Sequence, residues 1–259
     1  MDDSVPKYYR YWGKADADGA YHLLPYHCLD VAAVAKTWWN ESPTIRNAFS
    51  GKSFLNPEQM QAWVLFFIAL HDIGKFDIRF QRKILKTWRL LQCPSKSTRL
   101  SVADSKGYQH GTAGLCWVSL EFDEIVRGKK KDHQEYGDDF FNFGEWELDE
   151  GEDSIRRSWK PWLEAVTGHH GSLIKVENIN LTPLPSECPP QYQSTDKAAR
   201  KSWFLILEIL FLKPVGLSLK DSPPAPPGSA FLAGFCSVSD WLGSANSEDR
   251  FSYLVSCHA

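Results

Sequence analysis

Five histidines and two aspartates of this chain have the types and positions expected of metal ligands. They are His27, His71, Asp72, His110, His169, His170 and Asp240. Each of the histidines lies in an apolar stretch, at the start or end of a predicted helix. Neutral imidazole and carboxylate together form the ligand set of a transition-metal site. The pattern therefore predicts a metal centre assembled from several helix ends.

The adjacent pair His71–Asp72 ends the apolar part of FFIALHDIGKFD (66–77). Neighbouring residues on a helix diverge by about 100°, so both side chains can reach a metal at the mouth of a cavity, and the two oxygens of Asp72 can bridge two ions. His169 and His170 repeat the arrangement at another helix end. Two ions roughly 4 Å apart can clamp the attacking and leaving oxygens of a phosphodiester and generate hydroxide at neutral pH.

Each of these residues, taken alone, also has a purely structural explanation. A lone histidine on an apolar helix is more often a hydrogen-bonded core residue than a ligand. Gly74 and the polar residues around it match ordinary helix termination. Two buried imidazoles side by side, however, need partners to offset their desolvation. Taken together, the histidines and aspartates at helix ends favour the metal centre.

Basic and aromatic residues alternate directly after the His71–Asp72 pair. The cations are Arg79, Arg82, Lys83, Lys86 and Arg89, and the rings are Phe76, Phe80 and Trp88. Cations that follow phosphates and rings that stack on bases are typical of a path for single-stranded nucleic acid. The alternative is a solvated helix face whose aromatic side chains turn inward. The closeness of this run to the predicted ligands favours the nucleic-acid path.

Helical periodicity dominates the rest of the sequence. It predicts helices over 25–39, 59–72, 110–126, 158–170, 196–212 and 230–244. The second of these follows the capping sequence Asn56-Pro57-Glu58 and is apolar around nearly its whole circumference, so we expect it to be central and buried. Strand signals are few, with a weak candidate at 173–181. We therefore expect one all-α domain over residues 1–259.

Three segments have the composition of irregular connections. They are the acidic segment 128–153, the segment 181–194 and the Pro-rich segment 222–228. We expect the first to be a mobile surface loop. Thirteen Asp/Glu against four Lys/Arg between residues 121 and 153 give a local charge of −9, whereas nine Lys/Arg against two Asp between residues 75 and 106 give +7. Such segregation predicts an oriented electrostatic surface.

The overall composition is that of a soluble globular protein, with 43% hydrophobic and 24% charged residues. A net charge of −3 excludes a wholly basic nucleic-acid binder. No apolar run is long enough to span a bilayer, and the N-terminal residues lack a secretion signal, so we expect a cytoplasmic protein with no membrane partner. The six cysteines are scattered and form no CxxC pair, which favours reduced thiols.

The order H…HD…H…HH…D resembles that of the HD metal-dependent phosphohydrolases. More closely, the chain resembles the HD nuclease domain of the CRISPR-associated helicase–nuclease of type I systems, the type I-E form especially. The matching motifs are YWGK (11–14), HLLPYHCLDVAAVA (22–35), FFIALHDIGKFDIRFQ (66–81), QHGTAGL (109–115), WLEAVTGHHG (162–171) and LAGFCSVSDWLGS (232–244). The resemblance covers nearly the whole chain and implies an HD-domain helical bundle with long irregular loops.

The resemblance implies a role for each site residue. One ion is expected on His27, His71, Asp72 and Asp240, and a second on Asp72, His110, His169 and His170. Imidazole-rich sites favour Fe, Mn, Co or Ni over Mg. Asp72 and Lys75 are the expected catalytic residues. Lys75 matches the lysine of the family's HDxxK motif and, one turn beyond His71, can offset charge on the scissile phosphate or compensate a helix dipole. Ser244 is expected to touch the substrate backbone.

By the same resemblance, we expect a two-metal nuclease that hydrolyses single-stranded DNA in CRISPR antiviral defence. Its partners would be a helicase domain or subunit and an RNA-guided surveillance complex. The GKS at 51–53 is no phosphate-binding loop, because Arg46 stands where the motif requires glycine. We therefore expect the helicase to be separate or missing. Two alternatives stay open. One is an HD-type nucleotide phosphohydrolase with a closed pocket, and the other is a non-cutting docking module with weak metal binding.

Overall fold

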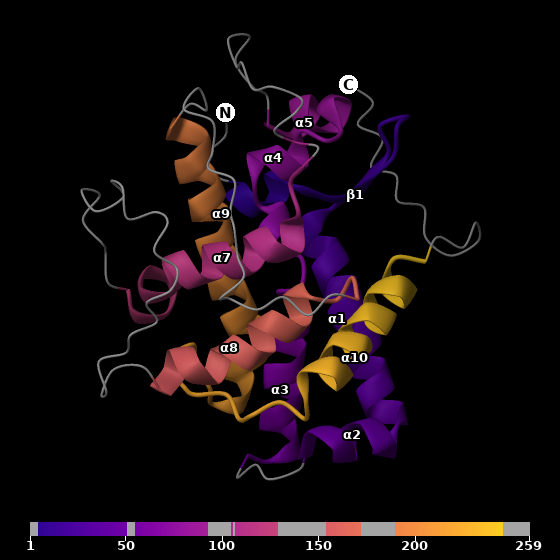
Figure 1. Cartoon of the computed structure of the whole chain (residues 1–259), viewed down its shortest axis with the longest axis vertical. Coiled ribbons are helices and arrows are strands. Elements are labelled where there is room, and N and C mark those ends of the chain that lie inside the picture. The colour runs from indigo at the N-terminus through magenta and orange to yellow at the C-terminus, as the bar shows by residue number, and fades with distance from the viewer. Residues whose placement is uncertain are drawn as a thin grey trace.

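The computed structural model describes residues 5–50, 55–92, 105, 107–128, 154–171 and 190–245 (Figure 1). The first elements are η1 (Lys7–Arg10), β1 (Trp12–Ala15), β2 (Tyr21–Leu23), α1 (Leu24–Glu41), α2 (Pro43–Ser50), α3 (Pro57–Ile68), η2 (Ile73–Lys75), α4 (Ile78–Gln81) and α5 (Leu85–Gln92). They are followed by α7 (His110–Phe122), η3 (Asp123–Arg127), α8 (Ser154–Thr167), α9 (Pro190–Leu207), η7 (Glu208–Leu212), η8 (Lys213–Val215) and α10 (Ser229–Gly243). The described elements are helical apart from one short ribbon, which confirms the predicted all-α bundle.

Several predicted segments fall outside the described residues. They are the candidate strand 173–181, all of the acidic segment after residue 128, and residues 181–189 of the connection 181–194. The Pro-rich segment 222–228 is described and is irregular, as predicted. None of the described helices combines the length and the hydropathy that a membrane crossing requires.

Helix α3 is the central element and is buried from Ala62 onward. Its start is fixed by a capping box, in which the Asn56 side chain accepts from the Gln59 amide and the Gln59 side chain accepts from the Asn56 amide. The predicted helix ran to residue 72, but α3 ends at Ile68. From Leu70 onward the amides that follow the helix bond three residues back, in a tight turn. The His71–Asp72 pair therefore lies in a turn beyond the helix, between α3 and η2.

Aromatic side chains from α3 and its neighbours form the main core. Phe67 of α3 stacks on Trp162 of α8 with 4.9 Å between ring centroids, and Trp159 packs edge-on against both Phe66 and Phe67 at 5.4 and 5.2 Å. Burial of one large apolar side chain stabilises a fold by roughly 1.5–3 kcal/mol, and Phe204 of α9 joins the same cluster. The core thus fixes the ends of α3 and α8 from which the metal-binding candidates project.

Other helix boundaries also differ from the predicted ones. Helix α8 starts at Ser154, four residues earlier than expected, so Pro161 lies inside it and not in its first turn. Helix α9 starts at Pro190 and continues past residue 207 as a π-helical turn. Helices α2 and α5 were not predicted, because each is only eight residues long. Short elements give too few periods for an apolar pattern to stand out.

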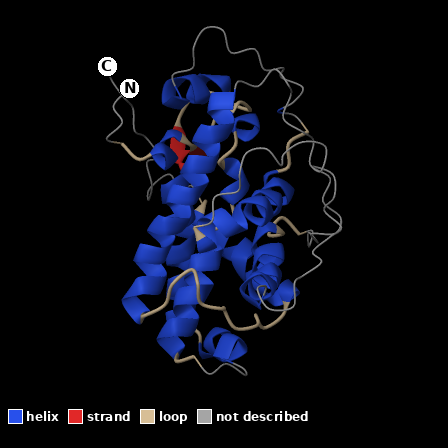
Figure 2. Ribbon diagram, turned by 90° about the vertical axis from the view of Figure 1, so that its left-hand side faces the viewer, coloured by secondary structure: helices blue, strands red, loops and turns tan. Residues whose placement is uncertain are grey.

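The ribbon of β1 and β2 was not predicted either. Its two strands pair antiparallel around the turn that contains Asp16, whose side chain accepts from the amides of Gly19 and Ala20. Gly19 has a φ of +95°, a conformation that glycine adopts without strain. The signal in the sequence was the turn DADG. It was missed because the strands on either side have only four and three residues, too few to show an alternating pattern. Figure 2 shows this ribbon among the helices towards one end of the bundle.

Two glycines allow η2 to lie directly against the start of α7. A Cβ on Gly74 would lie 1.9 Å from the His110 carbonyl oxygen, and one on Gly114 would lie 2.9 Å from the Gly74 nitrogen. Real Cβ atoms do not approach other atoms so closely. The contact of Gly74 with α7 therefore brings His110 beside the His71–Asp72 turn.

We predict that Gly74→Ala destabilises the protein by about 3 kcal/mol or more, because the added methyl group meets backbone atoms that cannot move aside. Urea unfolding followed by circular dichroism measures the change. The matched control is Gly234→Ala. Gly234 is exposed in the middle of α10, and no atom lies within 4 Å of its Cβ position. This control should be stabilised by about 0.5–1 kcal/mol. Equal unfolding midpoints for the two variants would contradict the close backbone contact.

Candidate metal centre

The structure brings all seven predicted ligands together from five parts of the chain. The contributing segments are α1 (His27), the turn after α3 (His71, Asp72), the start of α7 (His110), the turn after α8 (His169, His170) and the last turns of α10 (Asp240). Three overlapping groups of these residues have ligand atoms within 4.8 Å of one another. Residues separated by more than 200 positions thus share one site.

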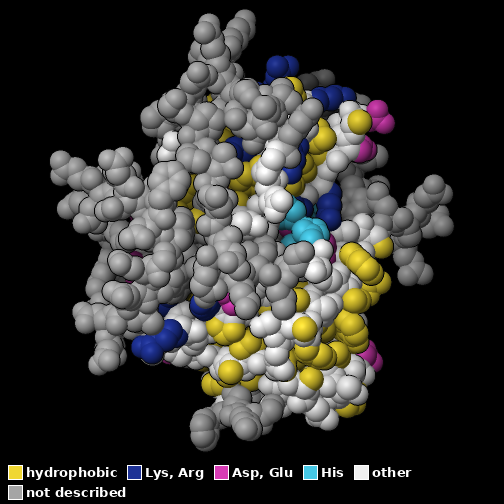
Figure 3. Space-filling view, viewed as in Figure 1, with side chains coloured by type: hydrophobic (Ala, Val, Ile, Leu, Met, Phe, Trp, Pro, Cys, Tyr) yellow, Lys and Arg dark blue, Asp and Glu magenta, His cyan; other side chains and the backbone are white. Residues whose placement is uncertain are grey.

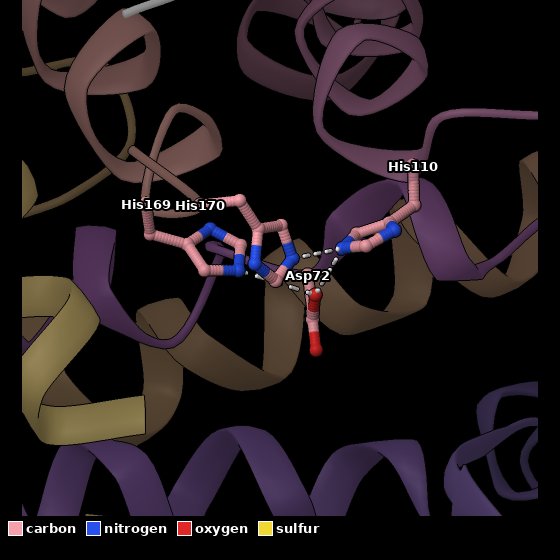
Figure 4. Close-up of side chains that lie close together, drawn as sticks. All are labelled: Asp72, His110, His169 and His170. Atoms are coloured by element: carbon pink, nitrogen blue, oxygen red, sulfur yellow. Dashed lines mark hydrogen bonds and ion pairs between the residues drawn. The ribbon is translucent and has the colours of Figure 1, made fainter. Parts of the chain in front are cut away.

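Asp72 lies at the middle of the cluster and is buried (Figure 4). Its Oδ2 is 3.0 Å from His27 Nε2 and 3.3 Å from His71 Nε2. Its Oδ1 faces the other way, 3.2 Å from His110 Nε2 and 3.8 Å from His169 Nε2. One carboxylate therefore presents each of its oxygens to a different set of imidazoles, which is the arrangement of a bridging ligand.

Asp240 completes the inner side of the cluster. Its Oδ1 is 3.4 Å from His27 Nε2 and its Oδ2 is 4.0 Å from His169 Nε2. Ser244, one helical turn later, donates a 2.8 Å hydrogen bond to Asp240 Oδ1. The structure thus gives Ser244 the task of orienting a carboxylate. The expectation that it touches substrate is not tested by this contact.

The outer side of the cluster is open. His110 is partly buried, whereas His170 is exposed, and their Nε2 atoms lie 2.9 Å apart. Figure 3 shows histidine side chains at the surface beside Lys or Arg side chains. The backbone under this pair is fixed, because Ser237 of α10 donates a hydrogen bond to the His169 carbonyl. A ligand from solvent can therefore approach the cluster at His170 without a change of fold.

Two hydrogen bonds set the tautomers of the inner histidines. His71 Nδ1 is 2.9 Å from the Ile68 carbonyl oxygen, and His169 Nδ1 is 2.7 Å from that of Val166. A carbonyl only accepts, so both rings carry their proton on Nδ1 and turn the Nε2 lone pair into the cluster.

The cluster also contains buried polar atoms that lack a hydrogen bond of regular geometry within the described residues. They are Asp72 Oδ1, His169 Nε2 and His27 Nδ1. Unpaired buried acceptors are costly, and the first two face each other across the cluster. Acceptors of this kind fit a divalent cation, and their N/O chemistry fits a transition metal.

Burial favours the neutral form of four of these histidines. Desolvation lowers the pKa of His27 to about 4 and that of His169 to about 3. It also lowers the pKa values of His110 and His170. Burial alone would raise the pKa of Asp72, but the Lys75 ammonium and the surrounding imidazoles together outweigh it and hold this pKa well below its usual range. At neutral pH the site therefore offers free imidazole nitrogens and an ionised carboxylate.

Lys75 lies inside the site. Its ammonium is 2.6 Å from Asp72 Oδ2 and donates a 2.9 Å hydrogen bond to the Gly13 carbonyl, and the residue is 5% exposed. The Phe80 ring lies 5.2 Å from this ammonium. Lys75 thus neutralises the Asp72 carboxylate instead of facing solvent. Among the described residues its ammonium bonds to a strand carbonyl, that of Gly13, and not to the carbonyls at a helix end, which its alternative role requires.

The predicted nucleic-acid path divides into inner and outer residues. Arg79 is buried and paired with Asp77 through hydrogen bonds of 2.9 and 2.7 Å, and its guanidinium lies 4.7 Å from the centre of the Tyr108 ring. A side chain engaged in this way holds the fold together, so Arg79 does not belong to a surface path. Arg82 is half-buried, 5.3 Å from the centre of the Trp88 ring.

Lys83 is exposed and donates to the Tyr108 carbonyl. The rings of Phe76, Phe80 and Trp88 are all buried. The inward-facing alternative is therefore right for the aromatic residues, and a base has no access to their faces.

Sequence reasoning missed a buried network behind the site. Arg200 of α9 pairs with Glu121 of α7 and donates to the Phe76 carbonyl at 2.6 Å. Asp196, one turn earlier, accepts from the Ile78 amide at 2.9 Å and from the Tyr11 hydroxyl at 2.6 Å. The available signal was the pair of opposite charges at i and i+4 in DKAAR, beside the apolar face of a long helix. This network fixes the backbone that follows Lys75.

Comparison with known proteins identifies relatives along nearly the whole chain. Residues 12–248 match the family model described as "Cas3, HD domain". The CRISPR-associated endonuclease/helicase Cas3 of Escherichia coli (strain K12) is 42% identical over 250 residues, which is 94% of this chain and 26% of that protein. The chain thus spans about a quarter of the length of the curated relative it matches.

Solved structures share the fold at lower sequence identity. The crystal structure of T. fusca Cas3 superposes with a TM-score of 0.59 and 20% identity, over 93% of this chain and 23% of that one. A chain in a structure titled "CRISPR RNA-guided surveillance complex, pre-nicking" gives a TM-score of 0.56 at 20% identity, over 93% of this chain and 25% of that one. These likenesses establish the fold of the described helices.

We predict that the metal-free protein loses stability as the pH falls from 7 to 5. His27 has a pKa of about 4 when folded and about 6.5 when unfolded. In this pH range the unfolded chain therefore binds more protons than the folded chain, and the free energy of unfolding decreases as the pH falls. The loss due to His27 should be about 2 kcal/mol, measured by urea unfolding in the presence of a chelator. His27→Gln should remove that share, and an unchanged slope in this variant would contradict the burial effect.

We predict that Mn²⁺, Co²⁺ or Ni²⁺ raises the melting temperature of the metal-free protein, because a ligand that binds only the folded state stabilises it, by about 2.7 kcal/mol at a hundred times its Kd. Differential scanning calorimetry and elemental analysis measure the shift and the stoichiometry. Asp72→Asn should weaken the binding of both ions, whereas Asp240→Asn should weaken the binding of one. Asp221→Asn, whose carboxylate contacts Ser218 at the surface, is the control and should behave like wild type. Equal metal content in all variants would exclude the bridging role of Asp72.

Proposed function

The chain belongs to the Cas3 HD-domain family, and from that premise we propose that it is a metal-dependent nuclease that hydrolyses phosphodiester bonds in single-stranded DNA. The observation that supports this most directly is the buried carboxylate of Asp72, whose two oxygens face separate sets of imidazole nitrogens. Two-ion sites of this design suit phosphodiester hydrolysis.

We assign the ligands in two sets that share Asp72. The first set is His27, His71, Asp72 and Asp240, and the second is Asp72, His110, His169 and His170. Bound ions supply a Lewis acid for the phosphate and a water of lowered pKa. The ring centroids of His71 and His169 lie 4.8 Å apart, so the two sets adjoin. This spacing supports a pair of neighbouring ions.

The protein contributes charge balance and orientation to this chemistry. Asp72 and Asp240 bring two negative charges into the site, and Lys75 offsets part of that charge from within. The backbone hydrogen bonds of His71 and His169 keep the Nε2 lone pairs available for the ions. Because these groups are fixed by the ends of α3 and α8, little reorganisation is needed when an ion and a phosphate arrive.

The open side of the site favours a polymer substrate over a small nucleotide. A nucleotide phosphohydrolase needs a pocket that encloses its substrate, whereas here His170 is exposed and its neighbour His110 is partly exposed. The non-cutting docking module is disfavoured, because all seven ligands are present and converge.

A helicase and an RNA-guided surveillance complex are the proposed partners, by analogy with relatives described in those terms.

Cleavage of circular single-stranded DNA in the presence of Mn²⁺, Co²⁺ or Ni²⁺ tests the proposal directly. We predict that wild-type protein degrades the circle and that Asp72→Ala lowers the rate by about 100-fold or more, because both ions lose a ligand. Gel analysis of products over time measures the rates. Asp221→Ala serves as the control with a surface carboxylate removed.

Two results would count against the proposal. One is a metal-loaded wild-type protein that leaves the circle intact but releases phosphate from free nucleotides, which would select the nucleotide phosphohydrolase. The other is a protein with neither activity although its metal content is complete, which would rule out both hydrolases. Absence of both activities together with weak metal binding would select the docking module.

A further inference from the structure

We propose that Lys14 binds a backbone phosphate of the nucleic acid at the metal centre. This inference rests on the proposed function, and it assigns a task to the YWGK motif that the ligand sets leave without one. It also moves the phosphate contact from Lys75, where the sequence placed it, to a second lysine on β1.

Two lysines approach the carboxylates of the site from opposite sides. Lys75 reaches Asp72 from the interior and is already engaged by the Gly13 carbonyl. Lys14 reaches Asp240 from the rim, with Nζ 3.6 Å from Oδ1, and its side chain is 43% exposed. Only a cation with an exposed side chain can meet an incoming phosphate without breaking buried contacts. Of these two lysines, Lys14 meets that condition.

The backbone that carries Lys14 is fixed relative to the site. Gln81 accepts from the Trp12 amide at 2.9 Å and donates to the carbonyls of Trp12 and Lys75 at 3.0 and 2.9 Å. The next residue, Gly13, packs directly on His27, where a Cβ would lie 2.9 Å from the His27 Cβ. Strand β1 is therefore held against His27 and, through Gln81, against the backbone of Lys75. The ammonium of Lys14 can reach only a limited region at the edge of the site.

The contact with Asp240 does not account for this placement. A separation of 3.6 Å exceeds hydrogen-bond length, and solvent around the exposed Lys14 side chain screens its attraction to the buried Asp240. Asp240 Oδ1 already accepts from Ser244. When Asp240 ligates an ion, the positive charges of the ion and Lys14 repel each other, and an anion between them removes the repulsion. A phosphate oxygen held by the ions is such an anion, and an ammonium binds it as a charged donor.

Binding of single-stranded DNA tests this inference independently of cleavage. The probe is a fluorescein-labelled phosphorothioate oligothymidine, which resists hydrolysis, and anisotropy is recorded with Mn²⁺ over a series of KCl concentrations. We expect Lys14→Ala to weaken binding by about fivefold to tenfold and to reduce the slope of log K against log salt by about 0.7, the value for one phosphate contact on a single strand. Lys14→Arg should keep the wild-type slope, since it keeps the charge.

The matched control is Lys213→Ala. Lys213 is also exposed and also lies near one carboxylate, 3.7 Å from Glu208, but the Val215 carbonyl beside it contacts Gln59 at the start of α3, the end of that helix opposite to the His71–Asp72 turn. This variant should bind like wild type. Elemental analysis should show the same manganese content in all variants.

The outcomes separate this inference from the proposed function. Wild-type affinity and slope in Lys14→Ala, or no binding by the wild type, would overturn the role of Lys14. Loss of manganese in Lys14→Ala would also overturn it, because Lys14 would then support Asp240 and not the substrate. Lys14-dependent binding by a protein that cuts no DNA would support Lys14 while contradicting the nuclease.

Discussion

A carboxylate that is removed from water must be surrounded by positive charge or hydrogen-bond donors, and the site depends on how this constraint is met at Asp72. The residue is almost completely buried, and burial alone would favour its neutral form. Lys75 supplies one positive charge from the interior, but the opposite oxygen faces His110 and His169 without a regular hydrogen bond in the described structure. The protein's own groups thus compensate the charge on one oxygen of Asp72, and the other oxygen is left available to a cation.

The backbone around Asp72 is held from several directions, and this explains why distant elements are needed. Gly74 allows close contact with α7, while the Tyr108 hydroxyl donates to the Gly74 carbonyl at 2.7 Å. Arg200 of α9 binds the Phe76 carbonyl, and Gln81 binds that of Lys75. These bonds satisfy carbonyls that have no helical partner in a short irregular segment. The segment that carries the Asp72 carboxylate is therefore held in place although it is not a regular helix.

Much of this centre could be predicted from the sequence, because chemically distinctive residues in apolar surroundings are informative on their own. The histidines and aspartates lie close together, as expected. Helix α3 is central and buried, which was also expected. The end of α3 was misplaced, because apolar periodicity continues through Ala69 and Leu70 although the hydrogen bonds change. The direction of the Arg79 side chain could not be predicted either, since it depends on Asp77 and on the rings of Tyr108 and Trp117. Such contacts arise from packing between elements, which a linear pattern does not encode.

The helix ends beneath His71 and His169 couple backbone geometry to ligand basicity. In each case the imidazole donates to the carbonyl three residues earlier, which belongs to the last turn of α3 or α8. If either turn frayed, the ring would lose its acceptor and its proton could move to Nε2, the atom that faces the site. The site would then lose a lone pair although the side chain had hardly moved. Proton placement on these two rings is thus a local measure of helix integrity, and a bound ion would act in reverse as a clamp on both helix ends.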